Sequence, residues 1–173
     1  LRRQRQMCIR DSQLDGVAHL RTLGKVQLLE DRMIEEKPRS KLGIAHTRWA
    51  THGEPSETNA HPHKSNEEVF IVHNGIIENH LELKAELEKE GYSFASQTDS
   101  EIIAHLLDFN LKQGMTMIEA MFASKKRLDG AYAIAAMHRD DESKLVIARQ
   151  KSPLLIGLGT CLLYTSDAAD EVD

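Results

Sequence analysis

Four side chains that could bind an acidic small molecule fall within five consecutive positions of the sequence. The stretch GIAHTRWATHG places Arg48 and Trp49 after a short apolar run, and Thr51 and His52 follow. The planar guanidinium of Arg48 suits a carboxylate, Trp49 offers a rigid wall, and the other two residues offer neutral hydrogen-bonding groups. An alternative is a surface arginine whose aliphatic stem lies on Trp49. Spacing alone slightly favours this alternative.

The segment HNGIIEN, residues 73–79, offers a second chemical possibility. Asn-Gly is the commonest signal for a two-residue hairpin, so one interpretation is a type I′ turn. The apolar stretch after it is short and runs into an expected helix cap, which fits a hairpin poorly. Alternatively, the Asn74 amide and the Gly75 backbone N–H could direct two donors at an oxyanion, because glycine lets the backbone approach closely.

Asp99 is a third candidate, because it lies in the first turn of an expected helix. The helix dipole stabilises a carboxylate there, so Asp99 by itself fits routine helix chemistry. As part of a site, Asp99 could instead hold a ligand ammonium group while Arg48 holds a carboxylate. Together the two residues would recognise an α-amino acid by its two charged ends.

Histidines are concentrated in the same part of the chain, where six of the nine fall between positions 46 and 80. Their spacings match no strong zinc pattern, and no cysteine lies near them. We therefore predict no metal site and expect structural histidines that hydrogen-bond to the backbone. The two cysteines, Cys8 and Cys161, do not make a disulfide framework.

The elements that must position these residues alternate between short branched apolar runs and helical periods. Strands are expected at residues 69–77, 131–137, 144–148 and 154–159, and the GIAHTRW stretch is expected to begin as another. Because the last three strands follow one another through short turns, the sheet should be largely antiparallel with helices packed on it. The predicted fold class is α+β.

Three helices are expected, each opened by a capping pattern in which a first side chain and an acid three residues later satisfy exposed N–H groups. The pairs are Asn79 with Glu82, Thr98 with Glu101, and Thr116 with Glu119. Apolar stripes predict the buried face of each helix. The stripe residues are Leu83 and Leu87 in the first helix, Ile102, Ile103, Leu106 and Leu107 in the second, and Met117, Ile118, Met121 and Phe122 in the third.

Composition limits the class of protein. The 173 residues are 40% hydrophobic, which is enough for one domain with a real core. A net charge of −5 gives no basic excess for nucleic acid or an anionic membrane, and no segment is apolar over a bilayer-spanning length. We interpret the chain as cytoplasmic, with a small molecule or another protein as its partner. One domain is expected over residues 13–159, and residues 1–12 and 160–173 are interpreted as foreign or disordered.

Several long motifs, taken in order, resemble one family. They are GIAHTRWATHGEPSETNAHPH, VFIVHNGIIENHLELKAELEKEGY, SQTDSEIIAHLL, RLDGAYAIA and SPLLIGLG. Together they are similar to the glutaminase part of the isomerising glutamine–fructose-6-phosphate aminotransferases, over nearly the whole interior of the chain. The resemblance implies a class II glutamine amidotransferase domain, which releases ammonia for a separate sugar-phosphate isomerase domain that makes glucosamine 6-phosphate. It overrides the surface-arginine interpretation.

The resemblance also implies a fold and a role for each candidate residue. The implied fold is an N-terminal-nucleophile hydrolase type αββα sandwich of two antiparallel sheets, here incomplete at the N-terminus. L-glutamine is the implied substrate, no cofactor is implied, and the full-length enzyme is expected to be a homo-oligomer. The resemblance implies that Arg48 binds the α-carboxylate of glutamine and that Asp99 binds its α-amino group. It implies that Asn74 and Gly75 form the oxyanion hole. It also places Trp49, Thr51 and His52 in the loop that closes over the substrate.

One departure from the family pattern concerns the nucleophile. In the family this is an N-terminal cysteine followed by a Gly-Ile-Val-Gly type strand, and its own α-amino group is the base. MCIRDS matches only the first letters, and Cys8 lies 15 positions before Leu23, where the family has a much longer run. Cys161 lies in the unusual C-terminal segment and is no better a candidate. We therefore expect a fragment whose start was replaced, without glutaminase activity.

Two alternatives remain open at this point. Another class II amidotransferase, such as an amidophosphoribosyltransferase, usually carries Tyr-Ser where this chain has Trp49 and Ala50. A non-catalytic module that binds an amino acid would need only Arg48 and Asp99. A glutamine titration separates the module from an enzyme, because only an enzyme releases ammonia.

Overall fold

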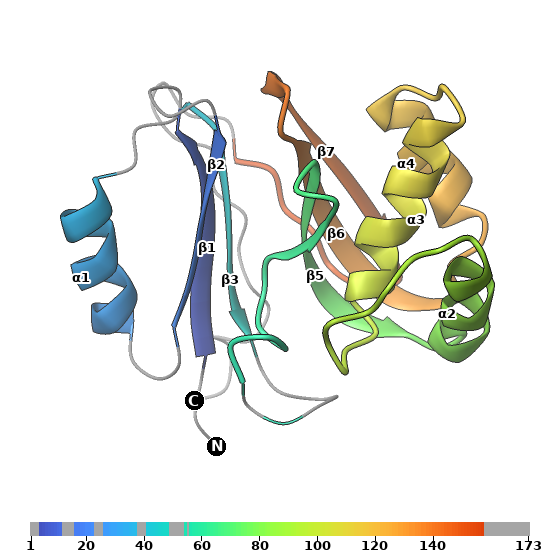
Figure 1. Cartoon of the computed structure of the whole chain (residues 1–173), viewed down its shortest axis with the longest axis horizontal. Helices are drawn as coiled ribbons and strands as arrows, with labels where there is room; N and C mark the ends of the chain where they lie inside the picture. The colour runs from blue at the N-terminus through green and yellow to red at the C-terminus, as the bar shows by residue number, and fades with distance from the viewer. Residues whose placement is uncertain are drawn as a thin grey trace.

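Two antiparallel sheets face each other in the middle of the structure, with helices on their outer sides (Figure 1). The structure is a computed structural model that describes residues 4–11, 16–22, 26–37, 41–48, 54 and 56–157. Helix α1 (Val26–Glu36) lies outside the first sheet, and helices α2 (His80–Lys89), α3 (Glu101–Lys112) and α4 (Met117–Lys125) lie outside the second. Within the described ranges, no helix is both long and apolar enough to cross a bilayer.

The first sheet has three strands in the order β2-β1-β3. They are β1 (Gln4–Asp11), β2 (Gly16–Thr22) and β3 (Gly43–Arg48), and β3 confirms the strand expected at GIAHTRW. The sequence shows no strand period over residues 1–12, yet β1 is the central strand, in register with both neighbours. Backbone pairing on two sides needs no particular side-chain pattern, which is why periodicity missed it. The interpretation of residues 1–12 as foreign stays a prediction.

The second sheet has four strands in the order β4-β5-β6-β7, all antiparallel. They are β4 (His63–Ser65), β5 (Val69–Ile77), β6 (Gly130–His138) and β7 (Asp141–Gln150). Three of the expected strands are therefore confirmed. The strand expected at residues 154–159 is absent from its described part, residues 154–157, where Leu155 and Ile156 are exposed. An apolar run without a neighbouring strand to pair with does not become a strand.

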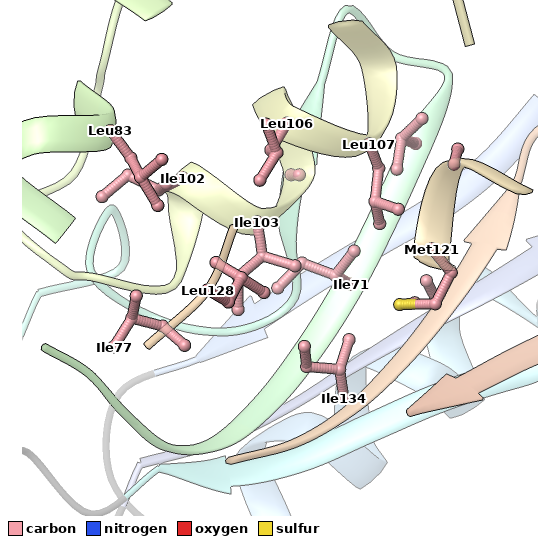
Figure 2. Close-up of a cluster of buried hydrophobic side chains, with 14 of the residues drawn as sticks. Ile71, Ile77, Leu83, Ile102, Ile103, Leu106, Leu107, Met121, Leu128 and Ile134 are labelled. Carbon is pink, nitrogen blue, oxygen red and sulfur yellow. The ribbon is translucent and has the colours of Figure 1, made fainter. Parts of the chain in front are cut away.

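The main core fills the space between the second sheet and its helices (Figure 2). Helix α3 lies at its centre, with the stripe formed by Ile102, Ile103, Leu106 and Leu107 buried as predicted. Leu83 and Leu87 of α2 are buried as predicted too. From the sheet, the core receives Ile71 and Ile77 of β5 and Ile134 of β6. Asp99 lies in the turn before α3 and not in its first turn as expected, and this turn leads directly into the helix that apolar packing fixes.

The stripe predicted for α4 is only partly correct. Met121 is buried, but Ile118 is 50% exposed and Phe122 is 65% exposed. The buried side of α4 instead includes Ala120 and Ser124, and the Ser124 hydroxyl accepts a hydrogen bond from Asn110 of α3 at 3.0 Å. Small residues let the two helices approach closely, so the contact with α3 rotates the larger side chains outward.

Of the three predicted capping boxes, only the one at Thr116 is confirmed. The Thr116 hydroxyl accepts the Glu119 N–H at 3.3 Å, and the Glu119 carboxylate accepts the Thr116 N–H at 2.8 Å. The Asn79 side chain makes no cap bond in the described structure; it binds the Arg127 carbonyl and the Asp129 N–H instead. The Asn79 side chain therefore binds residues far away in the sequence instead of capping α2.

The box predicted at Thr98 is also wrong, because α3 begins later. Ser100 is the residue that precedes the first turn, and the Glu101 carboxylate accepts the N–H groups of Ala95 and Ser96 at 3.0 and 2.6 Å. The Thr98 hydroxyl lies 3.1 Å from Nε2 of His63 on β4. These bonds fix the turn that leads into α3.

Candidate active site

Asn74 and Gly75 lie inside β5, not in a hairpin turn. The strand pairs with β6 continuously from Val69 to Ile77, and Asn74 is in register with Ala133. The type I′ turn interpretation is therefore wrong. Successive side chains of a strand point to opposite faces, so the buried His73 and the exposed Asn74 lie on different faces of the sheet.

Gly75 has a backbone that only glycine accommodates. Its φ is +142°, and a Cβ at this position would lie 2.1 Å from the Ala131 carbonyl oxygen and 2.7 Å from Cα of Tyr132. Both atoms belong to the backbone of β6, so no rotamer change could relieve the clash. An unusual backbone conformation that the surrounding structure enforces is typical of functional positions. The glycine also leaves the backbone beside Asn74 uncovered by a side chain.

Asp99 lies against the end of the strand that carries Asn74. Its side chain is buried, with 4% exposure, and Oδ2 accepts the Ile77 N–H at 2.7 Å. Oδ1 lies 3.5 Å from the Ser100 hydroxyl. A carboxylate can accept about four hydrogen bonds, so it has capacity left for a ligand ammonium group. The Asp99–Ile77 bond places Asp99 beside the end of the strand that carries Asn74 and Gly75.

His73 forms a second link between β5 and the start of α3. Its Nδ1 lies 2.8 Å from the Ser100 hydroxyl, and both side chains are buried. Burial lowers the pKa of His73 to about 4, and the nearby Asp99 charge opposes that shift. The imidazole is therefore neutral at neutral pH. Sequence reasoning missed the contact of Ser100 with His73, because the two residues meet only once α3 lies against β5.

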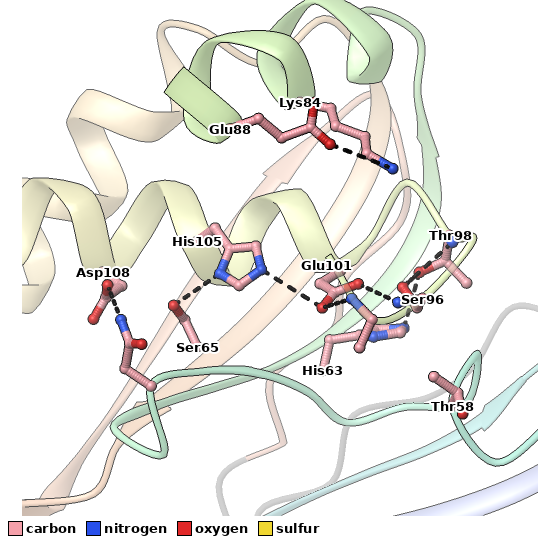
Figure 3. A network of polar contacts seen from close by, with 12 residues as sticks. Thr58, His63, Ser65, Lys84, Glu88, Ser96, Thr98, Glu101, His105 and Asp108 are labelled. Carbon is pink, nitrogen blue, oxygen red and sulfur yellow. Dashed lines mark hydrogen bonds and ion pairs between the residues drawn. The ribbon is translucent and has the colours of Figure 1, made fainter. Parts of the chain in front are cut away.

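A polar network behind this turn holds α3 to β4 (Figure 3). His105 of α3 contacts the Ser65 hydroxyl through Nδ1 at 2.9 Å, and its Nε2 lies 3.5 Å from Glu101. Burial alone would raise the pKa of Glu101, but hydrogen bonds from His105 and Ser96 and from backbone N–H groups lower it to about 2. Glu101 therefore stays ionised and keeps the turn before Asp99 in place.

Three histidine rings pack on one another between the two sheets. The ring of His61 lies 4.2 Å from that of His46 on β3 and 4.8 Å from that of His63 on β4, measured between centroids. Of the six histidines expected to bond to the backbone, His80 does so through the Ile77 carbonyl, whereas His63 and His73 contact the hydroxyls of Thr98 and Ser100 instead. His19, outside that group, contacts the Pro62 carbonyl. Among the described residues, no group of three His, Cys, Asp or Glu side chains could hold a metal ion.

The arginine half of the predicted site is only partly described. Arg48 is the last residue of β3 and is in register with Gln4 of β1. The Arg48 side chain and residues Trp49, Thr51 and His52 lie outside the described residues. The same is true of the Cys8 side chain and of Cys161, although the backbone of Cys8 lies in β1. The roles of these residues stay predictions.

The residues that follow position 53 are held by hydrogen bonds from two side chains whose role the sequence did not indicate. Asn59 donates to the carbonyl of Glu54 at 3.0 Å and accepts the Gln97 N–H at 2.8 Å. Arg21 of β2 donates to the carbonyls of Glu57 and Pro62 at 3.0 and 2.5 Å. The first sheet and the turn before α3 are thus both tied to residues 54–62.

The sequence matches a family model described as a glutamine amidotransferase domain over residues 46–169. It is 52% identical over 144 residues to the isomerizing glutamine–fructose-6-phosphate aminotransferase of Vibrio parahaemolyticus, and 53% identical over 143 residues to that of Escherichia coli K12. Each match covers 83% of this chain and 23% of the relative, so the chain spans less than a quarter of these relatives.

Two solved structures share the fold. One is a glutamine phosphoribosylpyrophosphate amidotransferase from B. subtilis, with a TM-score of 0.74 and 24% identity over 92% of this chain and 34% of that one. The other is an allosteric regulatory enzyme of purine biosynthesis, with a TM-score of 0.74 and 27% identity over 91% of this chain and 34% of that one. This likeness confirms the N-terminal-nucleophile hydrolase type sandwich. Together with this fold, the match over residues 46–169 shows that the chain belongs to the glutamine amidotransferase domain family.

Proposed function

We propose that, within the full-length protein that carries it, this domain hydrolyses L-glutamine and supplies the ammonia to a sugar-phosphate isomerase domain, which makes glucosamine 6-phosphate. The observation that carries the proposal is the hydrogen bond from the Ile77 N–H to Asp99, which holds an acid beside the strand of Asn74 and Gly75. Relatives about half identical in sequence are named for this reaction. The lower identity of the phosphoribosylpyrophosphate amidotransferase structure favours this function over that alternative.

Each end of glutamine is assigned its own residues. Asp99 binds the α-ammonium group, and Arg48 binds the α-carboxylate through a planar pair of hydrogen bonds. At the other end, the Asn74 amide and the Gly75 N–H stabilise the oxyanion that forms when a thiolate attacks the side-chain amide. Trp49, Thr51 and His52 line the loop over the substrate. The attacking thiolate is assigned to neither Cys8 nor Cys161.

These residue assignments define the class of substrate. Because Arg48 and Asp99 carry opposite charges, the site selects a free α-amino acid over a glutamine whose amino or carboxyl end is blocked. The distance from those charges to Asn74 then selects the length of the side chain. The proposal therefore predicts that N-acetylglutamine is neither bound nor hydrolysed.

Replacing Arg48 by lysine tests the proposal in the full-length protein that carries this domain. Arg48→Lys keeps the charge but loses the planar fork, so KM for glutamine should rise about tenfold or more. Release of glutamate and ammonia is the measurement, with N-acetylglutamine as the control substrate. Arg139→Lys is the matched control, because Arg139 is a surface residue paired with Asp140 and Glu68. An unchanged KM in Arg48→Lys would exclude the assigned role.

A further inference from the structure

The hydroxyl of Ser100 is not used where a serine at the start of a helix normally uses it. Ser100 is the N-cap residue of α3, but within the described structure its side chain makes no cap hydrogen bond. An N-cap serine usually accepts an N–H from the first turn, which stabilises the helix. Here the hydroxyl lies 2.8 Å from Nδ1 of His73, which is 27 positions earlier in the chain. A local stabilising bond has been exchanged for a tertiary one.

The two partners of this bond are the sequence neighbours of the proposed site residues. His73 directly precedes Asn74, and Ser100 directly follows Asp99. Both side chains are almost fully buried, with exposures of 2% and 3%. The bond from the Ile77 N–H to Asp99 adds a second link between the same two segments. Between them, the two bonds set how far the carboxylate of Asp99 lies from the strand of Asn74.

Ser100 can donate only one hydroxyl proton, and this sets the direction of the hydrogen bonds. The Ser100 hydroxyl lies 3.5 Å from Oδ1 of Asp99, an atom that can only accept when the carboxylate is ionised. The hydroxyl therefore points its proton at Asp99 and accepts from Nδ1–H of His73. The chain of donors runs from His73 through Ser100 to Asp99. It fixes one oxygen of the carboxylate, while the Ile77 N–H fixes the other.

We propose that His73 and Ser100 are a positioning pair for glutamine hydrolysis, which hold the ammonium-binding carboxylate at the spacing from Asn74 that matches the length of glutamine. This inference rests on the proposed function. A substrate held at both ends is sensitive to that spacing, since misplacement by about 1 Å can cost on the order of a hundredfold in rate. Neither residue touches the substrate in this role; each acts through its neighbour.

The test compares variants that share a shape but differ in the hydroxyl. Ser100→Thr keeps the hydroxyl, whereas Ser100→Val replaces it with a methyl group of the same size. In the full-length protein, Ser100→Val should lower kcat/KM for glutamine by about tenfold relative to Ser100→Thr. His73→Asn can still reach Ser100 from the place of Nδ1, so it should retain more activity than His73→Gln. The double variant His73→Gln/Ser100→Val should be no worse than the poorer single variant, because coupled residues are not additive.

Thermal melting separates positioning from a purely structural role. Equal kcat/KM in the Thr and Val variants would overturn the inference, and so would a loss that merely follows the fraction of folded protein. Amide hydrogen exchange of the β5 peptide, residues 69–77, adds a measurement that does not need activity. If the parent protein releases no glutamate, the proposed function fails, and amide hydrogen exchange alone then tests whether His73 and Ser100 position the two segments. Faster exchange in Ser100→Val than in Ser100→Thr supports it, and equal exchange overturns it.

Discussion

The two halves of the proposed site are built on sheets of different character. Asn74, Gly75 and Asp99 belong to the second sheet and its helices, where sixteen buried apolar residues form one continuous cluster. Arg48 ends a strand of the first sheet, where Leu20, Leu29 and Ile44 are the fully buried apolar residues among those described. The oxyanion and ammonium half is therefore positioned by a large apolar core. Around the carboxylate half, Ile44 of the first sheet packs against Phe70 and Met137 of the second, and Arg21 adds hydrogen bonds to the backbone carbonyls of Glu57 and Pro62.

The largest effect on stability is expected in the apolar core between the second sheet and its helices. Leu106→Ala removes a fully buried side chain of α3 and should lower the free energy of unfolding by about 2–5 kcal/mol. Leu29→Ala on α1 should cost less, because Leu29 is 4% exposed whereas Leu106 is completely buried. Urea denaturation of the two variants measures both costs. A loss at Leu29 as large as at Leu106 would break the comparison.

The next largest effect is expected on catalysis, at Asn74 on the second sheet. Asn74→Ala removes one proposed oxyanion donor, and such losses typically lower kcat by about 10²–10³. The fold should persist, because the Asn74 side chain is exposed on the face opposite His73. Glutamate release by the full-length protein, normalised to the folded fraction from circular dichroism, is the measurement. A collapse of stability with unchanged turnover per folded molecule would show that Asn74 is structural.

Acid should destabilise both halves, through the buried His73 in one and the half-buried His19 in the other. Burial lowers the pKa of His73 on β5 to about 4, and burial and the charge of Arg21 do the same for His19 on β2. The unfolded chain then binds more protons than the folded one, so stability is complete above about pH 6.5 and falls as the pH drops toward 4. For His73 the loss is on the order of 3 kcal/mol at most. Melting temperatures from pH 7.5 to 4 give the slope.

Single replacements show which half contributes to that slope. His19→Gln should flatten the acid dependence by removing the contribution of the first sheet, and His73→Asn should do so for the second. If neither variant changes the slope, these two histidines are not its source. A slope that only His73→Asn flattens would place the acid sensitivity entirely in the packed half.

The smallest effect is expected at a solvent-exposed end of the packed half. Thr116→Ala removes the capping box of α4 and should cost about 1 kcal/mol of unfolding free energy. Glutamine turnover should not change, since the larger contacts of α4 with other described elements are with α3 and β7 and not with β5. Thermal melting and the glutaminase assay check the two statements, and a loss of turnover would extend the site to α4.

Sequence patterns predicted the structural features that depend on residues close together in the chain. The branched run of β5, the stripe of α3 and the box at Thr116 were predictable because their partners lie within a few residues. The Asn-Gly signal failed as a turn because nine residues of β5 pair with β6, which outweighs a local preference. Asn79 and Thr98 failed as caps because their side chains found distant partners. The contact of His73 with Ser100 could not be predicted, since it exists only once α3 has docked on β5.

The close approach of β5 and β6 has a consequence for the mutational tolerance of this domain. Gly75 and Gly130 face the opposite strand in the same way, and a Cβ on Gly130 would lie 2.1 Å from the Ile76 carbonyl oxygen. In each case the obstacle is backbone, so a second substitution elsewhere could not restore the space. Saturation mutagenesis of the two positions should therefore return glycine alone. Ile76, which lies between them in the pairing and is 42% exposed, should accept many residues.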